Sequence, residues 1–213
     1  MFINHTEKKE MTWAEIKAAA DAGTIRELLS SGDRIPVTLK TGEEIELDIT
    51  YDENGKCYFV THDCLDGVYY MNARATNKGG WAASAMRSHL NGPVFESLPD
   101  ELREIIVPTK IVQILAGERV ECEDKLFCLS YTQVVGNDWP DMNRTEPEET
   151  HLDIFPTERS RVKECGDNGT WWYWLRSPVS SSSSSFLYVN GGSGSNGAAS
   201  NANGVSFGFC LNQ

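Results

Sequence analysis

The chain has 213 residues, 40% of them hydrophobic, and its 31 acidic and 19 basic residues give a formal net charge of -12. A chain of this size buries a sizeable core, so we expect a single domain over 1–213. The excess of carboxylates argues against nucleic acid as a partner, because neutralising phosphates needs clustered Lys and Arg. No apolar run approaches the roughly 20 residues that span a bilayer, and the N-terminal MFINHTEKKEMTW lacks the features of a signal peptide. We therefore expect no membrane span and no classical secretion.

The N-terminal part of the chain predicts two short helices. Thr12 followed by Glu15 is a capping box that starts the first helix, and Gly23 is its expected end. A second helical turn is expected over 25–29. The inward face of the first helix consists of Trp13, Ile16 and Ala20.

Three strands are predicted next. Apolar and polar residues alternate over 35–39 and again over 45–49, and the sequence KTGE between them is typical of a hairpin turn. A further strand follows the turn sequence DENG at 52–55. Together these strands predict a small antiparallel sheet.

The middle of the chain predicts two more helices and then strands and loops. Pro99 opens one helix and Pro108 ends it. From Ile111 onward the chain becomes rich in strands and loops, with a buried strand at 126–130 (LFCLS). The polar and acidic stretch 140–156 is either a surface excursion or an ordered insert. The apolar stripes of the two helices are Trp81, Ala85, Met86 and Leu90 in the first, and Leu102, Ile105 and Ile106 in the second.

A dense aromatic and basic segment, WWYWLRSP, occupies 171–178. We expect the four aromatic residues of 171–174 to be structural, because aromatic side chains of this size dominate cores and interfaces. We expect Arg176 to be buried or half-buried and to donate hydrogen bonds to loop carbonyls, which would fix the start of the segment that follows.

The segment 179–203 contains only Val, Ser, Phe, Leu, Tyr, Asn, Gly and Ala. Such composition is typical of a flexible spacer. The chain nevertheless ends in GVSFGFCL at 204–211, where Val205, Phe207 and Phe209 alternate with small residues as in a strand with one buried face. We therefore expect loops and short strands laid across a packed domain, with Phe186 and Val189 in the core.

The genetic code restricts the same segment. Every residue type found there is reached from an Asn codon ending in a pyrimidine by changing only adenines, whereas Lys, Glu, Gln, Met and Trp are not. This pattern is consistent with adenine-specific diversification.

The segments WLRSP and GVSFGFCL, with the Asn, Ser, Gly and aromatic residues between them, resemble the variable region of diversity-generating retroelement proteins. Upstream, GDRIPVTLKTGEEIELDI, GGWAASAMRSHLN, SLPDELREIIVPTK and DKLFCLSYTQVVG follow in the order seen in a bacterial and phage domain family with the same C-terminal module. The resemblance covers Thr12 to Leu211. It departs near the end, where GVSFGFCL replaces the Arg and Pro-Ala more usual in that strand.

The resemblance implies an α+β, C-type lectin-like fold with small antiparallel sheets and two or more flanking helices. It also implies that 174–211 is a variable region that binds a ligand, most simply another protein such as a cell-surface target, and that the chain is not an enzyme. A virion-associated or cytoplasmic location agrees with the missing signal peptide. No cofactor or metal is implied, because 179–203 holds no carboxylate to bind calcium. The oligomeric state is left open.

The ligand-facing positions expected from this resemblance lie throughout the segment. Only two of them are large, so few strong anchors for a partner are expected. The candidates are Val179, Ser181, Ser183, Leu187, Tyr188, Asn190, Gly192, Ser195, Asn196, Gly197, Asn201 and Asn203.

Two other functions stay open. Formylglycine-generating enzymes share a related fold and use paired cysteines, for which Cys165 and Cys210 are the candidates; a structural phage or surface component with a Ser/Gly spacer is the other alternative. Without a signal peptide we expect all six cysteines to be free thiols. The adjacent His62, Asp63 and Cys64 cannot converge on one metal ion in regular structure. No nucleophile elbow, P-loop or dinucleotide motif occurs.

Overall fold

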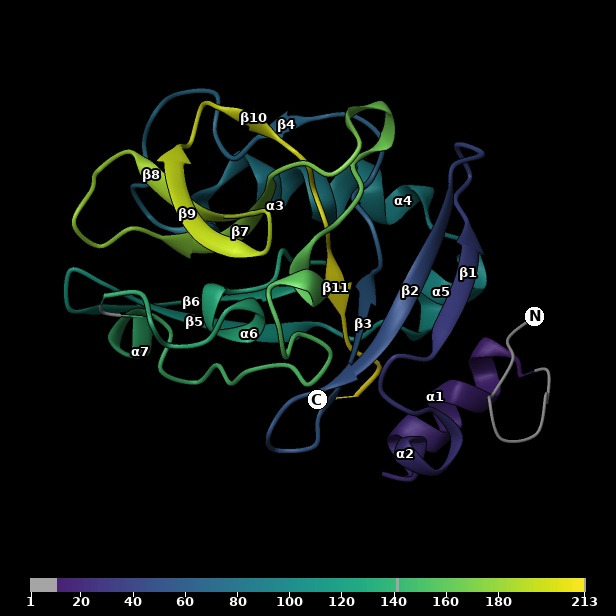
Figure 1. Cartoon of the computed structure of the whole chain (residues 1–213). Coiled ribbons are helices and arrows are strands. Elements are labelled where there is room, and N and C mark those ends of the chain that lie inside the picture. The colour runs from purple at the N-terminus through teal and green to yellow at the C-terminus, as the bar shows by residue number, and fades with distance from the viewer. Residues whose placement is uncertain (1–10, 141, 213) are drawn as a thin grey trace.

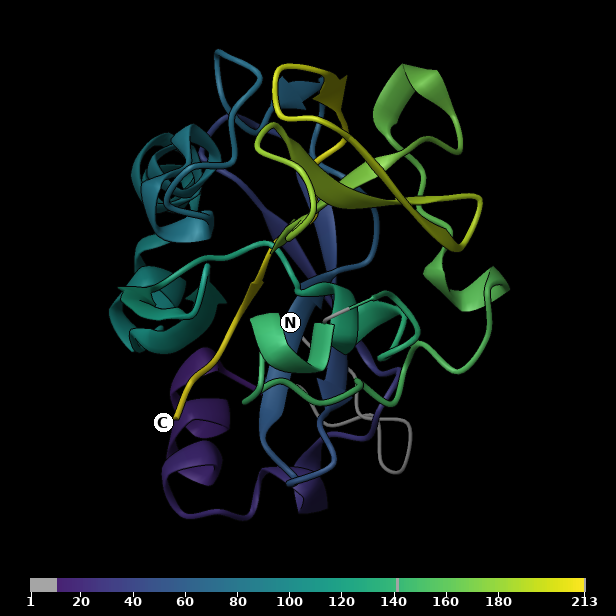
Figure 2. The same ribbon diagram turned by 90° about the vertical axis from the view of Figure 1, so that its left-hand side faces the viewer.

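The computed structural model describes residues 11–140 and 142–212, and it is an α+β fold built from small antiparallel sheets and short helices. Figure 1 shows three parts, with the sheet β7–β8–β9 above the two-stranded ribbon β5–β6 and a four-stranded sheet beside both. Figures 1 and 2 both show that β7–β8–β9 and the first two helices lie at opposite ends of the molecule. None of the helices formed by the described residues has the length and apolar content to span a bilayer.

The first helix, α1 (Trp13–Asp21), begins as the sequence predicts. The Thr12 hydroxyl accepts from the Glu15 backbone N–H at 3.3 Å, and the Glu15 carboxylate accepts from the Thr12 N–H at 2.8 Å, which satisfies two donors that a helix start leaves unpaired. Gly23 follows with φ 71°, a conformation that favours glycine. The predicted second turn is α2 (Ile25–Leu28). The predicted inward face, Trp13, Ile16 and Ala20, is buried.

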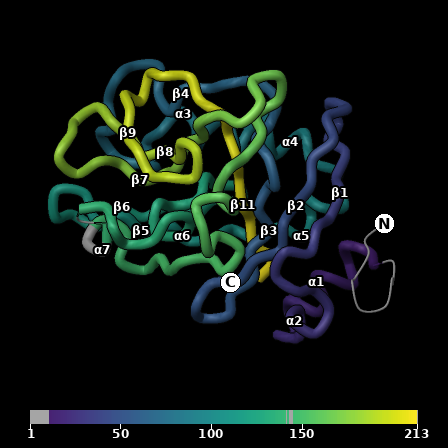
Figure 3. Tube along the Cα trace, viewed as in Figure 1, coloured from purple at the N-terminus to yellow at the C-terminus, as the bar shows by residue number. Residues whose placement is uncertain are grey.

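The four-stranded sheet has the order β1–β2–β3–β11, in which all neighbours are antiparallel. The predicted hairpin is β1 (Arg34–Thr38) with β2 (Glu44–Tyr51), and the strand after DENG is β3 (Cys57–Thr61). The closing strand β11 (Gly208–Phe209) pairs with β3, and Phe209 stacks on Phe59 with ring centroids 5.1 Å apart. Figure 3 traces this closing segment from the top of the molecule to the C-terminal end.

The closing segment differs from its predicted pattern because both of its faces are covered. Every residue of 204–211 is buried, including Ser206 and Cys210. The side chains of Leu129 and Phe127 cover Gly208 on the face of the small residues. Val107 and Phe127 also form isolated bridges to Cys210 and Gly208, which pair the strand edge away from β3. The strand therefore lies inside the molecule, which alternation alone does not reveal.

Helices cover the core between the sheets. The first predicted stripe forms a 3₁₀ turn (Trp81–Ala83), α3 (Ala85–His89), a π turn (Leu90–Val94) and α4 (Phe95–Ser97), with Ala85 exposed and the other three stripe residues buried. The second is α5 (Asp100–Ile105), where Leu102 and Ile106 are buried and Ile105 is partly buried. The Trp81 indole N–H donates to Asp124 Oδ2 at 2.7 Å, which ties the first group to the end of β6.

The ribbon consists of β5 (Thr109–Leu115) and β6 (Glu118–Asp124), joined by Ala116 and Gly117. The segment 126–130 after it is buried as predicted, but it forms an isolated bridge at Phe127 rather than a strand. The helices α6 (Tyr131–Val134) and α7 (Met142–Thr145) follow. Leu152 and Phe155 are buried, so the described part of 140–156 is an ordered insert packed on the core.

The segment 179–203 contributes most of the last sheet. The strands are β7 (Tyr173–Pro178), β8 (Ser185–Asn190) and β9 (Ser193–Ala198), in that order. A short strand β10 (Ala202–Asn203) then pairs with β4 (Tyr69–Tyr70). The expectation of loops and short strands laid across a packed domain is confirmed, with Phe186 and Val189 buried.

Candidate binding surface

Strand β7 is the rigid base of the surface. All six of its residues are buried, and the Arg176 side chain is 1% exposed. Its guanidinium donates to Cys128 O at 2.8 Å, to Gln133 Oε1 at 2.9 Å and to the Glu149 carboxylate. The predicted buried guanidinium bonded to a loop carbonyl is therefore confirmed. The sequence does not predict the bond between Arg176 and the Glu149 carboxylate.

The aromatic run before β7 divides into a buried and an exposed pair. Tyr173 and Trp174 are buried, in agreement with a structural role, but Trp171 and Trp172 are 41% and 37% exposed and so do not lie in the core. Trp172 lies between Trp171 and Tyr188, with ring centroids 5.8 and 5.2 Å away and interplanar angles of 17° and 4°. We call Trp171, Trp172 and Tyr188 the aromatic stack.

The stack is held on the sheet from below. The Tyr188 ring meets Trp174 edge to face with centroids 5.9 Å apart, and the Tyr188 hydroxyl accepts from Ser195 Oγ at 3.3 Å. The backbone of Trp172 is fixed as well, because its carbonyl accepts from the Gly204 N–H at 2.8 Å. Rigid rings with one side in solvent are the usual anchors of protein interfaces.

The candidate positions of 179–203 divide by exposure. Ser195 and Gly197 on β9 are partly exposed. The exposed candidates lie in the β7–β8 loop, at the end of β8, on β9 and before β10. They are Ser181, Ser183, Asn190, Asn196 and Asn201.

Five candidates do not face solvent. Leu187, Val179 and Tyr188 are buried, because they join the core that their strand and loop cover. Asn203 is buried where β10 pairs with β4. Gly192 is buried with φ 89°, and a Cβ there would lie 2.0 Å from the Glu158 carbonyl oxygen. The prediction that these five positions face the ligand is wrong.

These corrections also change the count of anchors. The sequence predicts Leu187 and Tyr188 as the only large outward groups, whereas the structure buries both and exposes Trp171 and Trp172. The feature that indicates their exposure is the position of the two tryptophans, which precede β7 rather than lie within it.

The Ser-rich β7–β8 loop is held by one side chain. Asn77 Nδ2 lies 3.1 Å from Val179 O, 2.7 Å from Ser182 O and 3.0 Å from Ser185 O, and the Asn77 backbone N–H donates to Ser183 O at 3.0 Å. A cavity of about 530 Å³ separates this loop from the β5–β6 turn. The exposed serines are thus presented on a fixed backbone beside a hollow.

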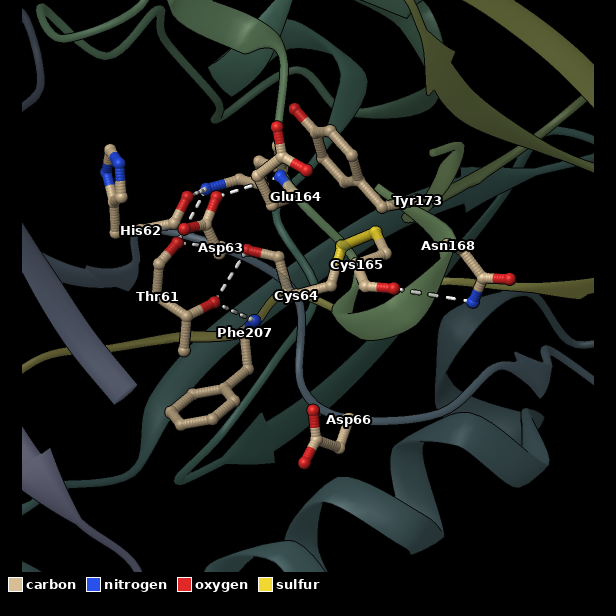
Figure 4. Close-up of a disulfide and its surroundings, with 12 residues drawn as sticks. Thr61, His62, Asp63, Cys64, Asp66, Glu164, Cys165, Asn168, Tyr173 and Phe207 are labelled. Carbon is tan, nitrogen blue, oxygen red and sulfur yellow. Dashed lines mark hydrogen bonds between the residues drawn. A yellow bond between two sulfur atoms is a disulfide. The ribbon is translucent and has the colours of Figure 1, made fainter. Parts of the chain in front are cut away.

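A disulfide joins Cys64 to Cys165, so the expectation that all six cysteines are free is wrong (Figure 4). The Gly204 backbone lies against both sulfur atoms, and a Cβ on Gly204 would come within 2.5 Å of Cys165 Sγ. Cys57, Cys122, Cys128 and Cys210 are free, and three of them are fully buried. The partners of the bridge are 101 residues apart, so no local sequence signal predicts it.

The buried Lys163 supports the same region. Its ammonium donates to Thr61 O at 2.5 Å and to His62 O at 2.7 Å. Burial lowers the pKa of Lys163 to about 8, although Asp48 and Asp63 oppose this. The group holds the chain just before the disulfide and has the contacts of a structural cation.

The residues of the alternative catalytic reading are not brought together. Cys165 is bonded to Cys64, and Cys210 is buried in the closing segment, where desolvation raises the pKa of its thiol to about 11. His62 Nδ1 instead lies 2.8 Å from Asp48 Oδ2. Within the described ranges, no three His, Cys, Asp or Glu side chains are arranged to hold a metal ion.

Comparison with known proteins gives one family. The model of DUF6273, described as a domain of unknown function, matches residues 54–213, from the turn before β3 to the C-terminal end. No curated protein and no solved structure matches the chain. The matched part contains β7–β8–β9, the aromatic stack and the disulfide, and the chain belongs to the DUF6273 family.

Proposed function

We propose that this protein is a ligand-binding variable protein with a C-type lectin-like fold, that it binds another protein, and that adenine-directed mutagenesis diversifies its C-terminal surface. The observation that carries the proposal is the aromatic stack, fixed on a sheet beside exposed Ser and Asn side chains. Aromatic rings with small polar neighbours let one backbone present many specificities.

The division within 179–203 supports the same function. Side chains exposed in this segment can change without disturbing the core, whereas its buried side chains cannot. The positions proposed to vary are the five exposed candidates together with Ser195 and Gly197. Tyr188 contributes a buried ring to the stack, and it belongs to the frame with the other four buried candidates.

The spacer alternative is weakened by the packing of the segment. A spacer has no need of buried residues, yet Phe186, Leu187 and Val189 all lie in the core. Limited proteolysis tests it directly, because a spacer is cut within 179–203 while the rest of the domain stays intact.

The genomic test examines the coding sequence around this gene. The proposal expects a nearby reverse transcriptase gene and a near-copy of the segment coding for 174–211 that differs only at adenines. Differences concentrated at codons for the exposed positions would support it. Finding neither gene nor copy would remove the case for diversification.

The binding test uses two displayed libraries. One randomises Ser181, Ser183, Asn190, Asn196 and Asn201 with codons ending in a pyrimidine, and the control randomises the same number of buried positions. Binders to a panel of proteins are expected only from the first library, and Trp172→Ala should weaken them by about thirtyfold, as expected for an interface hot spot of about 2 kcal/mol. Binders that ignore Trp172→Ala would contradict the proposed surface.

A further inference from the structure

Strand β9 has one edge without a partner strand. It is the last strand in the order β7–β8–β9 (Figure 1), and among the described residues it pairs only with β8, in a register without a bulge. Its six residues, SGSNGA, include no charged side chain and no proline. An outer strand of this kind presents backbone N–H and C=O groups to which a further strand can bond.

The pairing with β8 fixes which backbone groups point to this open edge. The Ala199 N–H, directly after β9, donates to Ser184 O at 2.8 Å. In an antiparallel pair every second residue bonds to the same neighbour, so the residues two, four and six places before Ala199 also bond to β8. The residues between them turn their N–H and C=O groups to the open edge. These outward residues are Gly194, Asn196 and Ala198.

The protein itself leaves this edge almost unused. Within 11–140 and 142–212, the outward groups have one backbone partner, the Asn201 N–H, which donates to Ala198 O at 2.9 Å. The three outward N–H groups have no acceptor anywhere in the described part of the chain. Asn196 is exposed, and Gly194 and Ala198 are partly exposed. The edge is therefore open to hydrogen bonds with another chain.

Three other outer strands are protected against such pairing. Strand β1 contains Pro36, which has no N–H to donate. Strand β6 consists mainly of charged residues, ERVECED. The outer edge of β7 is occupied by Gly204, whose carbonyl accepts from the Trp174 N–H at 3.0 Å. Natural proteins use such devices to prevent strand addition, so their absence from β9 marks this edge as a site of interaction.

We propose that the protein partner adds an extended segment to β9 as a further strand of the sheet. The segment bonds to the backbone of Gly194, Asn196 and Ala198, and its residues beside β9 are uncharged, because β9 has no charged side chain to pair with them. The inference rests on the proposed function and deepens it, since backbone bonds hold the partner while the side chains of Ser195, Asn196 and Gly197 vary. A second copy of this chain is a poorer occupant, because each copy carries a net charge of -12.

Hydrogen exchange on the unmodified chain tests the edge with a synthetic probe. The probe is the capped peptide Lys-Thr-Val-Thr-Val-Thr-Lys, and the control is the same peptide with its inner residues N-methylated, which keeps the charges and removes the donors. In the free protein the three outward amides should exchange at least about tenfold faster than the Ser195 amide, which bonds to β8. The probe at about 1 mM should slow their exchange at least about twofold, as at half occupancy, and the control should not.

Two results of this measurement would overturn the proposal. One is unchanged exchange of the outward amides in the presence of the probe. The other is slow exchange of these amides in the free protein that depends on protein concentration, which would identify a second copy of the chain as the occupant.

Two variants of one residue separate the backbone from the side chain. Asn196→Pro removes an outward N–H and no bond to β8, whereas Asn196→Ala removes the side chain and keeps the N–H. The proline variant should bind the probe about tenfold more weakly than the alanine variant, because one hydrogen bond is lost and its acceptor is left unpaired. Thermal unfolding checks that both variants fold. Equal binding by the two folded variants would contradict recognition through the backbone.

The same exchange measurement distinguishes this inference from the proposed function. A selected library member bound to its target protein should show protection of the three outward amides. A complex that leaves them unprotected would overturn strand addition and leave the variable surface standing. Protection by the probe, with no binder from either library, would support the open edge and contradict the diversified surface.

Discussion

Strands β7 and β9 flank the same central strand and differ in almost every respect. All six residues of β7 are buried, and they include Tyr173, Trp174 and Arg176. The six residues of β9, SGSNGA, include no side chain larger than Asn, and none of them is fully buried. One edge of the sheet is therefore fixed by packing and buried polar bonds, while the other is held mainly by its backbone pairing with β8.

This difference is what the proposed variable surface requires of the fold that carries it. Where backbone hydrogen bonds between strands hold the sheet together, exposed side chains contribute little to stability and are free to change. Where side-chain packing holds the sheet together, each substitution disturbs a packed neighbour. The comparison makes four predictions.

The largest effect is expected on β7. Arg176→Met should lower the free energy of unfolding by about 3–5 kcal/mol, because it leaves the buried carboxylates of Glu146 and Glu149 without their cation. Urea unfolding of both proteins measures the change. Ser195→Ala on β9 is the control and should stay within about 0.5 kcal/mol of the parent. A loss of stability in Arg176→Met as small as that in Ser195→Ala would contradict the difference between β7 and β9.

The second effect is expected at Gly192, in the turn before β9, where the backbone packs closely on Glu158. Gly192→Ala should cost about 1–3 kcal/mol by overpacking, beyond the strain of its positive φ, because the new Cβ meets the Glu158 carbonyl. The matched control is Gly191→Ala, which also has a positive φ but has nothing within 4 Å of its Cβ. Thermal unfolding should separate the two variants. Equal losses would mean that the backbone conformation alone is responsible.

The third effect concerns the loop that leaves β7. Asn77→Ala should lower the free energy of unfolding by about 1–2 kcal/mol, because it removes the amide that lies within hydrogen-bond distance of three loop carbonyls. Hydrogen exchange should become faster in 179–185 and stay unchanged in β8. Asn201→Ala, at an exposed amide, should change neither quantity. Unaltered exchange in Asn77→Ala would show that the loop is held by other contacts.

The smallest effect depends on pH. Desolvation raises the pKa of Glu146, which accepts from Ser177 Oγ at 2.6 Å beneath β7. A carboxyl group whose folded pKa lies above its unfolded value favours folding most below the unfolded pKa, and this contribution is lost as pH rises through the folded pKa. The parent should therefore gain stability relative to Glu146→Gln as pH falls from 7 to 5, by less than about 1.4 kcal/mol per pH unit. Parallel curves for the two proteins would contradict this.

The sequence predicts elements well where the signal is local. The capping box at Thr12 and Glu15, the KTGE hairpin and the strand after DENG all depend on neighbouring residues, and all are present in the structure. The buried guanidinium of Arg176 is also confirmed. For the cap, the hairpin and the strand, the pattern and the contact lie within one element or the next, whereas the partners of Arg176 are distant in the sequence.

The errors share a physical cause, which is contact between distant segments. Alternation in 204–211 predicts one buried face, but side chains of the distant segment 126–130 cover the other at Gly208. Composition around 187 cannot show which face of β8 the rest of the chain covers, so it does not predict the burial of Leu187 and Tyr188. It also does not predict the exposure of Trp171 and Trp172, which precede the strand that buries aromatic residues.

The bridge between Cys64 and Cys165 turns the middle of the chain into a covalent ring, with the helices α3 to α7 and the β5–β6 ribbon inside it. The segment that forms the proposed binding surface follows Cys165 and lies outside this ring. Its strand β10 pairs with β4 (Tyr69–Tyr70), which lies inside the ring. A cut anywhere in the ring would leave both pieces joined on a gel without reductant. A break in the middle of the chain therefore does not release the segment that forms the proposed binding surface.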